Sequence, residues 1–132
     1  MTDTSAFAAL ADEAFISLTT FRKSGEAVST PVWLARDGDA LIVTTPEESG
    51  KVKRLRNSGR VEMRPCTRMG AVAEGAPVVA GHARIIADAT TRDRLTAVIR
   101  KKYGIEFHLI TAIETIVAKR RKNRVILRIT EA

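Results

Sequence analysis

The fold is decided by the stretch Leu41-Ile42-Val43-Thr44-Thr45-Pro46-Glu47-Glu48-Ser49-Gly50-Lys51-Val52-Lys53-Arg54-Leu55-Arg56-Asn57. Its first part is rich in β-branched residues, which is typical of a buried strand, and Pro46 ends that strand. Its second part begins with Ser49, whose side chain can cap a helix by accepting backbone N–H bonds. Val52 and Leu55 share one face of this helix and are expected to pack inward. The sequence therefore predicts a strand that passes directly into a helix.

The start of this helix is a candidate binding site for an anion. It leaves free backbone N–H groups and the positive end of the helix dipole at one spot, which commonly binds phosphate. Gly50 keeps the backbone open to close approach, and Lys51, Lys53 and Arg54 add positive charge. Lys51 and Arg54 lie three residues apart and can face the same ligand. A strand followed by a basic, solvated helix is the alternative, and the local sequence leaves both interpretations open.

Composition limits the classes of protein and partner. The chain of 132 residues predicts one domain over residues 1–132, and its 45% of hydrophobic residues is enough for a core. Aromatic residues make up only 5%, so branched aliphatic residues must fill that core. A formal net charge of +7 predicts an anionic partner: nucleic acid, a membrane surface or a phosphorylated small molecule.

The cellular setting is predicted from cysteine use and from hydropathy. Cys66 is the one cysteine, which excludes an intrachain disulfide and a cysteine-based zinc site and fits a reducing cytoplasm. The N-terminal residues lack the basic start of a signal peptide. No apolar run approaches the roughly 20 residues that span a bilayer. We expect a cytoplasmic protein with no membrane partner.

Residue patterns along the chain predict the order of strands and helices. The expected strands are 15–21, 27–35, 40–45, 60–66, 78–86 with a bend at Gly81, and 125–129, with a short further piece at 71–73. The expected helices are 5–13, the helix after Ser49, 92–103 and 105–121. We expect Thr91 to cap the third helix and Gly104 to end it. Pro31 cannot donate to a strand ladder, so it favours an edge strand or a bulge. Short strands joined by tight turns predict an α+β fold, a small antiparallel barrel with helices packed outside.

Four motifs, in order and spacing, resemble one known family, the pyridoxamine-5'-phosphate oxidase-like split β-barrel superfamily. They are Leu18–Gly25, Thr30–Trp33, Ser49–Arg54 and Val61–Cys66, and the similarity covers roughly residues 10–130. The branch that the chain resembles most is the actinobacterial deazaflavin-dependent oxidoreductases, which use coenzyme F-420. The resemblance implies a split β-barrel of six or seven strands with Greek-key order and flanking helices, assembled as a homodimer with cofactor sites at the interface.

The resemblance also implies a cofactor site and an activity. The phosphate would bind at Ser49 and Lys51, and the ring would lie along the second and third strands. The implied cofactor-binding residues are Val28, Thr30, Pro31, Val32, Val43, Thr44, Thr45, Ser49, Gly50, Lys51, Lys53 and Arg54. The implied activity is transfer of hydride between reduced coenzyme F-420 and an unsaturated small molecule. Such a cofactor carries the reaction, so no catalytic side chain and no metal ligand is assigned.

One departure from the family pattern bears on the cofactor. Oxidase relatives that use flavin often carry Ser-Arg-Lys here, and Gly50 stands where they have arginine. This weakens the case for tight binding of flavin mononucleotide (FMN) and leaves room for the deazaflavin, whose tail bears a phosphodiester and several glutamates. An FMN-binding oxidase or reductase of the same fold is the alternative. A non-enzymatic binder of cofactor or nucleic acid is a third hypothesis, but nucleic acid is not favoured because few aromatic residues are available for stacking.

The remaining reactive side chains have structural interpretations beside functional ones. His82 and His108 are isolated, so packing or exposure is favoured over catalysis. Cys66 is expected as a small, buried residue, with cofactor contact as the alternative. Trp33 and Tyr103 are expected in packing, with a pocket wall or dimer contact and a proton donor as the respective alternatives. The basic run 119–124 is expected as a solvated loop, with a role in attracting an anionic tail as the alternative.

Overall fold

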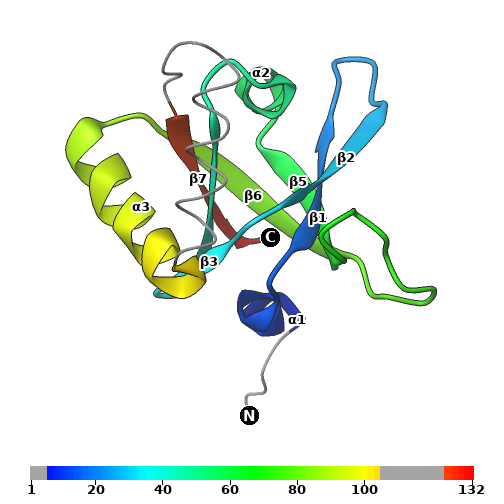
Figure 1. The fold of residues 1–132 in the computed structure, drawn as a ribbon. Helices are drawn as coiled ribbons and strands as arrows, with labels where there is room; N and C mark the ends of the chain where they lie inside the picture. The colour runs from blue at the N-terminus through cyan, green and yellow to red at the C-terminus, as the bar shows by residue number, and fades with distance from the viewer. Residues whose placement is uncertain (1–5, 105–123) are drawn as a thin grey trace.

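The computed structural model describes residues 6–104 and 124–132, which contain one antiparallel sheet of seven strands (Figure 1). The strands run β2-β1-β5-β6-β7-β4-β3 across the sheet. Their bounds are β1 (Ile16–Phe21), β2 (Ala27–Val32), β3 (Ala35–Asp37), β4 (Ala40–Pro46), β5 (Arg60–Pro65), β6 (Val79–Ile86) and β7 (Arg124–Glu131). The predicted strands 15–21, 40–45, 60–66, 78–86 and 125–129 are therefore present, with ends shifted by one or two residues.

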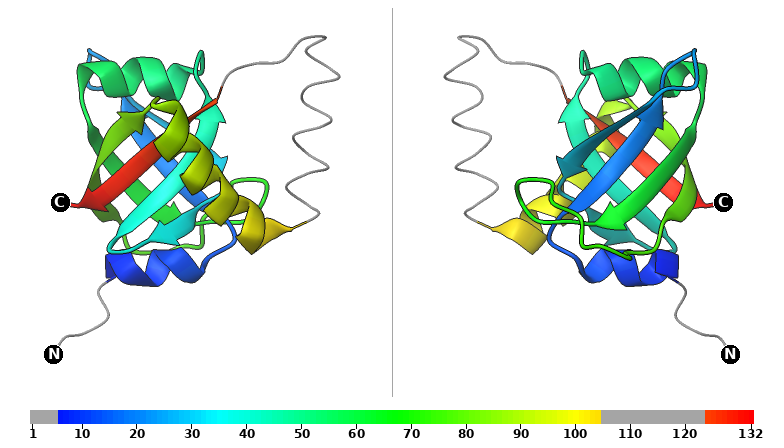
Figure 2. Two further views of the ribbon diagram at one scale, coloured as in Figure 1. Left: turned by 90° about the vertical axis from the view of Figure 1, so that its left-hand side faces the viewer. Right: turned by 90° about the vertical axis from the view of Figure 1, so that its right-hand side faces the viewer.

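The sheet curls into a split barrel because its two edge strands are neighbours in the chain. β2 and β3 are the outermost strands, yet only residues 33 and 34 separate them. Val32 and Ala35 are three Cα–Cα steps apart, which span at most ~11 Å, so the two edges must approach each other at this point. The curled sheet is plain in both views of Figure 2. The predicted α+β split barrel is confirmed.

The single strand predicted over residues 27–35 is wrong, because the chain crosses there from one edge of the sheet to the other. β2 pairs with β1 as far as Val32, and β3 pairs with β4 from Ala35 onward. The alternating residue pattern continues through the break and gives no sign of it. The prediction that Pro31 marks an edge is confirmed, since β2 lies at the edge of the sheet and Pro31 faces Ser17 of β1.

Helices close the two ends of the barrel and cover one side of it (Figures 1 and 2). They are α1 (Ala6–Ala9) with the 3₁₀ turn η1 (Leu10–Asp12), α2 (Gly50–Asn57) and α3 (Ala89–Tyr103). α2 lies across one end and α1 with η1 across the other, while α3 packs against β3, β4 and β7. Of the described residues in the expected helix 5–13, only Ala6–Ala9 are α-helical, and Leu10–Asp12 form the 3₁₀ turn. The expected helix 105–121 lies outside the described residues.

The start of α3 differs from the prediction, and its end agrees. Asp88, not Thr91, is the N-cap: its carboxylate accepts a hydrogen bond of 2.8 Å from the Thr91 backbone N–H. The helix therefore begins at Ala89, one turn earlier than Thr91 suggested, because an ionised carboxylate is a good cap acceptor. Gly104 ends the helix with φ of 61°, as expected.

The core lies on both faces of β4. Leu41 and Val43 pack inside the barrel, whereas Ile42 joins Leu95 and Ile99 of α3 outside it. Burial on both faces explains why this strand reads as a continuous apolar run. Val52 and Leu55 of α2 are buried, at 0% and 7% exposure, as the helical spacing predicted.

The expected strand piece at residues 71–73 is absent, and Gly81 lies within β6. Residues 71–73 form no strand; Ala71 instead closes a turn in which its carbonyl accepts from the Thr67 N–H at 3.0 Å. Gly81 pairs on both sides, with Val61 and Glu131. A Cβ on Gly81 would stand 2.9 Å from Ile129 Cγ2, so close packing of the neighbouring strand requires glycine at this point.

Candidate functional site

The strand-to-helix junction between β4 and α2 is built as the sequence predicted. Ser49 is the N-cap of α2, and its hydroxyl accepts a bond of 3.4 Å from the Val52 backbone N–H. The Thr45 hydroxyl, which is almost fully buried, donates to the Ser49 hydroxyl at 3.2 Å. The end of the strand thus fixes the cap of the helix. The first N–H groups of α2 and its positive dipole end lie beside these hydroxyls.

Arg54 is fixed by the barrel wall rather than free in solvent. Its Nε donates a bond of 2.6 Å to the hydroxyl of Thr20, which is completely buried in β1. A Cβ on Gly50 would stand only 2.8 Å from Arg54 Nη1, so the guanidinium lies over the place where a side chain at position 50 would begin. Gly50 therefore has a second role besides opening the backbone: it makes room for Arg54.

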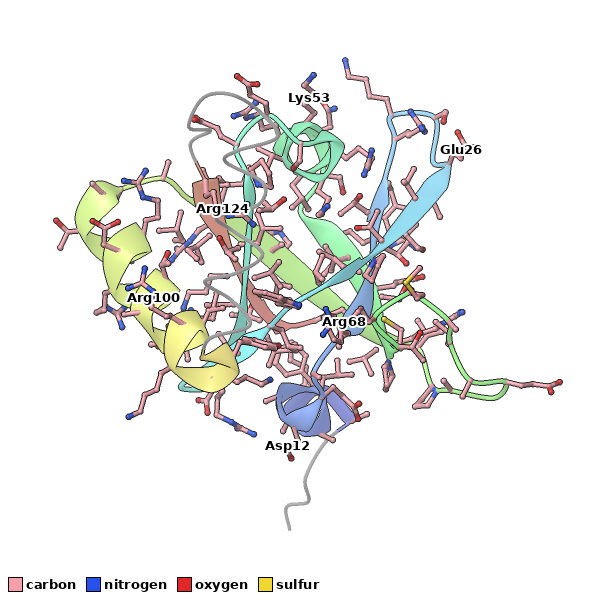
Figure 3. All side chains as sticks on the ribbon, viewed as in Figure 1. Asp12, Glu26, Lys53, Arg68, Arg100 and Arg124 are labelled. Carbon is pink, nitrogen blue, oxygen red and sulfur yellow. The ribbon has the colours of Figure 1, made fainter. Side chains whose placement is uncertain are left out.

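Arg124 joins this group from the last strand. Its Nε donates to the Thr44 hydroxyl at 3.1 Å, and its Nη2 donates to the Thr44 carbonyl at 3.2 Å (Figure 3). The contact follows from the pairing of β7 with β4, in which Arg124 faces Pro46. Sequence reasoning left Arg124 in a solvated basic run, because a pairing between residues 80 positions apart leaves no local signal.

Lys51 lies among these cations. Its side chain is half-buried, and among residues 6–104 and 124–132 no carboxylate lies within ion-pair distance of it. Burial lowers the pKa of Lys51, and the charges of Arg54 and Arg124 lower it further. The protonated amine is thus held in a place that disfavours its charge. We call Ser49, Gly50, Lys51, Arg54 and Arg124 the α2 cluster.

The other residues implied by the resemblance are not all brought to this cluster. Lys53 is exposed on the outer side of α2 (Figure 3). Val28, Thr30 and Val32 alternate inward along β2, whereas Pro31 faces outward. The Thr30 hydroxyl is buried and makes no hydrogen bond within the described part of the chain. Within the sheet, β2 hydrogen-bonds only to β1, so it does not pair with the segment Val43–Thr45 of β4.

The remaining candidates lie elsewhere in the fold. Tyr103 and Trp33 stack with ring centroids 4.8 Å apart, and Tyr103 bonds to the main chain of Ala14 and Leu34, near η1 and the β2–β3 crossover. Cys66 is half-buried, and burial together with the charge of Glu13 raises the pKa of its thiol. His82 is exposed on β6. His108 and residues 119–123 of the basic run lie outside the described residues.

Two further properties concern the described residues alone. They contain no group of three histidine, cysteine or acidic side chains that could hold a metal ion. They contain no helix that is both long enough and apolar enough to cross a bilayer.

Comparison with known proteins gives a family and a fold. A family model described as pyridoxamine 5'-phosphate oxidase matches residues 3–131. No curated protein matches the chain. Solved structures that share the fold include a conserved hypothetical protein from Mycobacterium tuberculosis, with 20% identity, a TM-score of 0.68, and coverage of 99% of this chain and 81% of that one.

Two other neighbours have different named roles. An F-420 reductase has 17% identity and a TM-score of 0.62, with 97% of this chain and 94% of that chain covered. The haem storage protein HutZ from Vibrio cholerae has 10% identity and a TM-score of 0.65, with 92% and 83% covered. At these identities the likeness concerns the fold alone.

Proposed function

The chain belongs to the pyridoxamine 5'-phosphate oxidase family, and we propose that it is an oxidoreductase that binds coenzyme F-420 at the α2 cluster. In this proposal it transfers hydride between the reduced deazaflavin and an unsaturated small molecule. The proposal rests mainly on Lys51, a half-buried amine beside Arg54 and Arg124 that has no carboxylate within ion-pair distance among the described residues. A site of this kind gains most from an anion, because a bound phosphate relieves the repulsion between cations.

The residues present fit a phosphate-bearing cofactor. The Ser49 cap and the first N–H groups of α2 supply hydrogen-bond donors, and Lys51 with Arg54 and Arg124 supplies charge. Thr20 and Thr44 hold the two arginines in place, so less freedom is lost when the ligand binds. The deazaflavin, when bound, supplies the hydride chemistry. The protein's part is to bind it, orient it and exclude water.

The ring would lie toward β2, where one buried polar atom supports the proposal. The Thr30 hydroxyl makes no hydrogen bond within the described chain, although buried polar groups nearly always find a partner. A ring carbonyl or nitrogen of the cofactor would supply that partner. We further propose that a second copy of the chain completes the site at a dimer interface and that the protein is cytoplasmic.

FMN is the second candidate cofactor, and one observation favours it. Flavin-using relatives often place an arginine at the position of Gly50, and here the Arg54 guanidinium lies over Gly50. Arg54 would then supply the charge that position 50 lacks. The same phosphate site serves both cofactors, so the α2 cluster alone does not choose between them. The proposal favours F-420, whose glutamate tail suits a chain of net charge +7.

The test is a fluorescence titration of the purified protein with coenzyme F-420 and, separately, with FMN. Saturable binding of F-420 that is much tighter than binding of FMN supports the proposal; the reverse order assigns the protein to FMN. Lys51→Ala should weaken binding by ten- to a hundredfold, since a charged hydrogen bond contributes about 1.5–3 kcal/mol. Lys101→Ala is the matched control, because Lys101 is exposed on α3. Equal losses in the two variants would show that general positive charge, not the α2 cluster, attracts the ligand.

A further inference from the structure

At the end of the barrel opposite α2, three main-chain oxygens surround one ammonium group. Lys102 Nζ, at the end of α3, donates to the carbonyl oxygens of Ala11 at 3.0 Å, Glu13 at 2.7 Å and Leu34 at 2.9 Å. We call these three oxygens the carbonyl site. An ammonium group has three N–H donors, so the three carbonyls satisfy it completely.

The carbonyl site exists for a structural reason that does not involve the lysine. Ala11 and Glu13 lie at the end of η1, where a helix leaves carbonyl groups without an intrahelical partner. Leu34 lies in the crossover between β2 and β3, where no ladder can use its carbonyl. Oxygens that two different elements leave outside any helix or ladder bond therefore meet at one point and are open to a donor; the Leu34 oxygen also lies 2.7 Å from the Tyr103 hydroxyl.

Two carboxylates and an aromatic ring partly compensate the cost of placing a positive charge at this point. Burial lowers the pKa of Lys102, and the charges of Asp12 and Glu13 act against that lowering. The Tyr103 ring lies 5.3 Å from Lys102 Nζ, within the range of a cation–π contact. Oxygen ligands, nearby carboxylates and an aromatic ring together are the features of a site for an ammonium ion.

We propose that the carbonyl site is a binding site for a primary ammonium ion, which this chain fills with its own Lys102, and that a free alkylammonium ion binds there when the lysine is removed. The inference is independent of the proposed function, because the site lies at the other end of the barrel from the α2 cluster. The bound cation joins three parts of the chain: η1, the β2–β3 crossover and α3.

The test removes the lysine and supplies the ion from solution. Lys102→Ala should lower the midpoint of thermal unfolding by several degrees, and added propylammonium should restore part of this loss. Tetramethylammonium carries the same charge but has no N–H donor, so it should restore nothing. Lys101→Ala is the matched control and should neither lose the stability nor respond to propylammonium. Trp33, the chain's one tryptophan, lies in the crossover and reports the transition by fluorescence.

The outcomes decide the proposal in either direction. The proposal is supported if propylammonium raises the unfolding midpoint of Lys102→Ala and does not raise that of Lys101→Ala. No recovery, or equal recovery with tetramethylammonium or in Lys101→Ala, overturns it. If Lys102→Ala does not fold, the same titration is made with Lys102→Gln, whose side chain is one atom shorter than that of lysine and carries no charge. In isotope-labelled wild-type protein, slow exchange of the Lys102 ammonium protons is expected, and exchange as fast as that of Lys101 would overturn the proposal.

Discussion

The Tyr103 hydroxyl contacts both main-chain polar groups of Leu34. It accepts from the Leu34 N–H at 2.9 Å, and its one proton is shared between the carbonyls of Leu34 and Ala14, each 2.7 Å away. Leu34 is completely buried and lies between β2 and β3, where no neighbouring strand is available. A tyrosine hydroxyl therefore takes the place of a strand partner, and this allows the chain to cross between the two edges of the sheet.

Tyr103→Phe should destabilise the protein by about 1–3 kcal/mol, the cost of leaving a buried donor unsatisfied. The ring stacking with Trp33 is kept, so the loss isolates the hydroxyl. Urea unfolding followed by Trp33 fluorescence measures the effect. Stability equal to that of the wild type would mean that the Leu34 N–H needs no protein partner.

The stability of the wild type should fall as the pH rises from 10 to about 12. Burial raises the pKa of Tyr103 from 10.0 to about 12. In this window the unfolded chain loses the tyrosine proton while the folded chain keeps it. Ionisation therefore stabilises the unfolded state relative to the folded one, and the free energy of unfolding falls. The stabilisation is fully present below pH 10. Tyr103 is the one tyrosine of the chain, so its tyrosinate absorbance reports the titration directly. A midpoint near 10 would contradict the burial of the hydroxyl.

The sequence predicted the strands and the fold class well, because most strands are buried on at least one face and their side-chain periods are clear. It did not predict the break at residues 33 and 34. Alternation continues across the break, and the partner that makes the crossover stable, Tyr103, lies 69 residues away. The expected cap of α3 at Thr91 is wrong, because several residues that can cap a helix lie close together in that stretch and only geometry distinguishes them.

The candidate site could be predicted only as far as its parts are local. Ser49, Gly50, Lys51 and Arg54 follow one another at the start of α2, so their spacing alone brought them together. Thr20 contacts Arg54 from strand β1 of the barrel wall, and Arg124 lies beside β4 because β7 pairs with it. Neither long-range contact can be recognised in the sequence. Only the hydrogen bonds between Thr20 and Arg54 and between Arg124 and Thr44 place these two residues at the site.

Lys51→Met should stabilise the protein without ligand while it weakens cofactor binding. The pKa of Lys51 is lowered below 10.5, so the folded state disfavours its charge; this destabilisation is present below the lowered pKa and fades as the pH rises toward 10.5. Removing the amine removes the penalty. Thermal unfolding at neutral pH, with and without ligand, measures both effects. A lower midpoint in the ligand-free variant would show that the amine has a stabilising partner.

Thr20→Val should cost about 1–3 kcal/mol of stability and also weaken ligand binding. Valine fills the same volume, but Arg54 Nε then loses its 2.6 Å acceptor inside the barrel wall. The arginine is left free to turn, so binding loses a pre-positioned charge. Thr19→Val is the matched control: it removes an exposed hydroxyl bond of 2.6 Å to Ser29 on the other face of β1 and leaves the acceptor of Arg54 in place. If binding is unchanged in Thr20→Val, Arg54 is a structural residue and not part of the ligand site.

Gly50→Ala tests whether glycine is needed at position 50 because the Arg54 guanidinium occupies the space of a side chain there. Alanine favours a helix over glycine by about 0.5–1 kcal/mol, so the variant should unfold no more easily than the wild type. Its Cβ would stand 2.8 Å from Arg54 Nη1, however, and the guanidinium must move away. Binding of the cofactor should therefore weaken while stability is kept, as measured by fluorescence titration and thermal unfolding of the same sample. In an Arg54→Lys background the guanidinium is absent, so Gly50→Ala should have little further effect on binding. Additive losses in the double variant would mean that glycine serves the approach of the ligand to the backbone and not the position of Arg54.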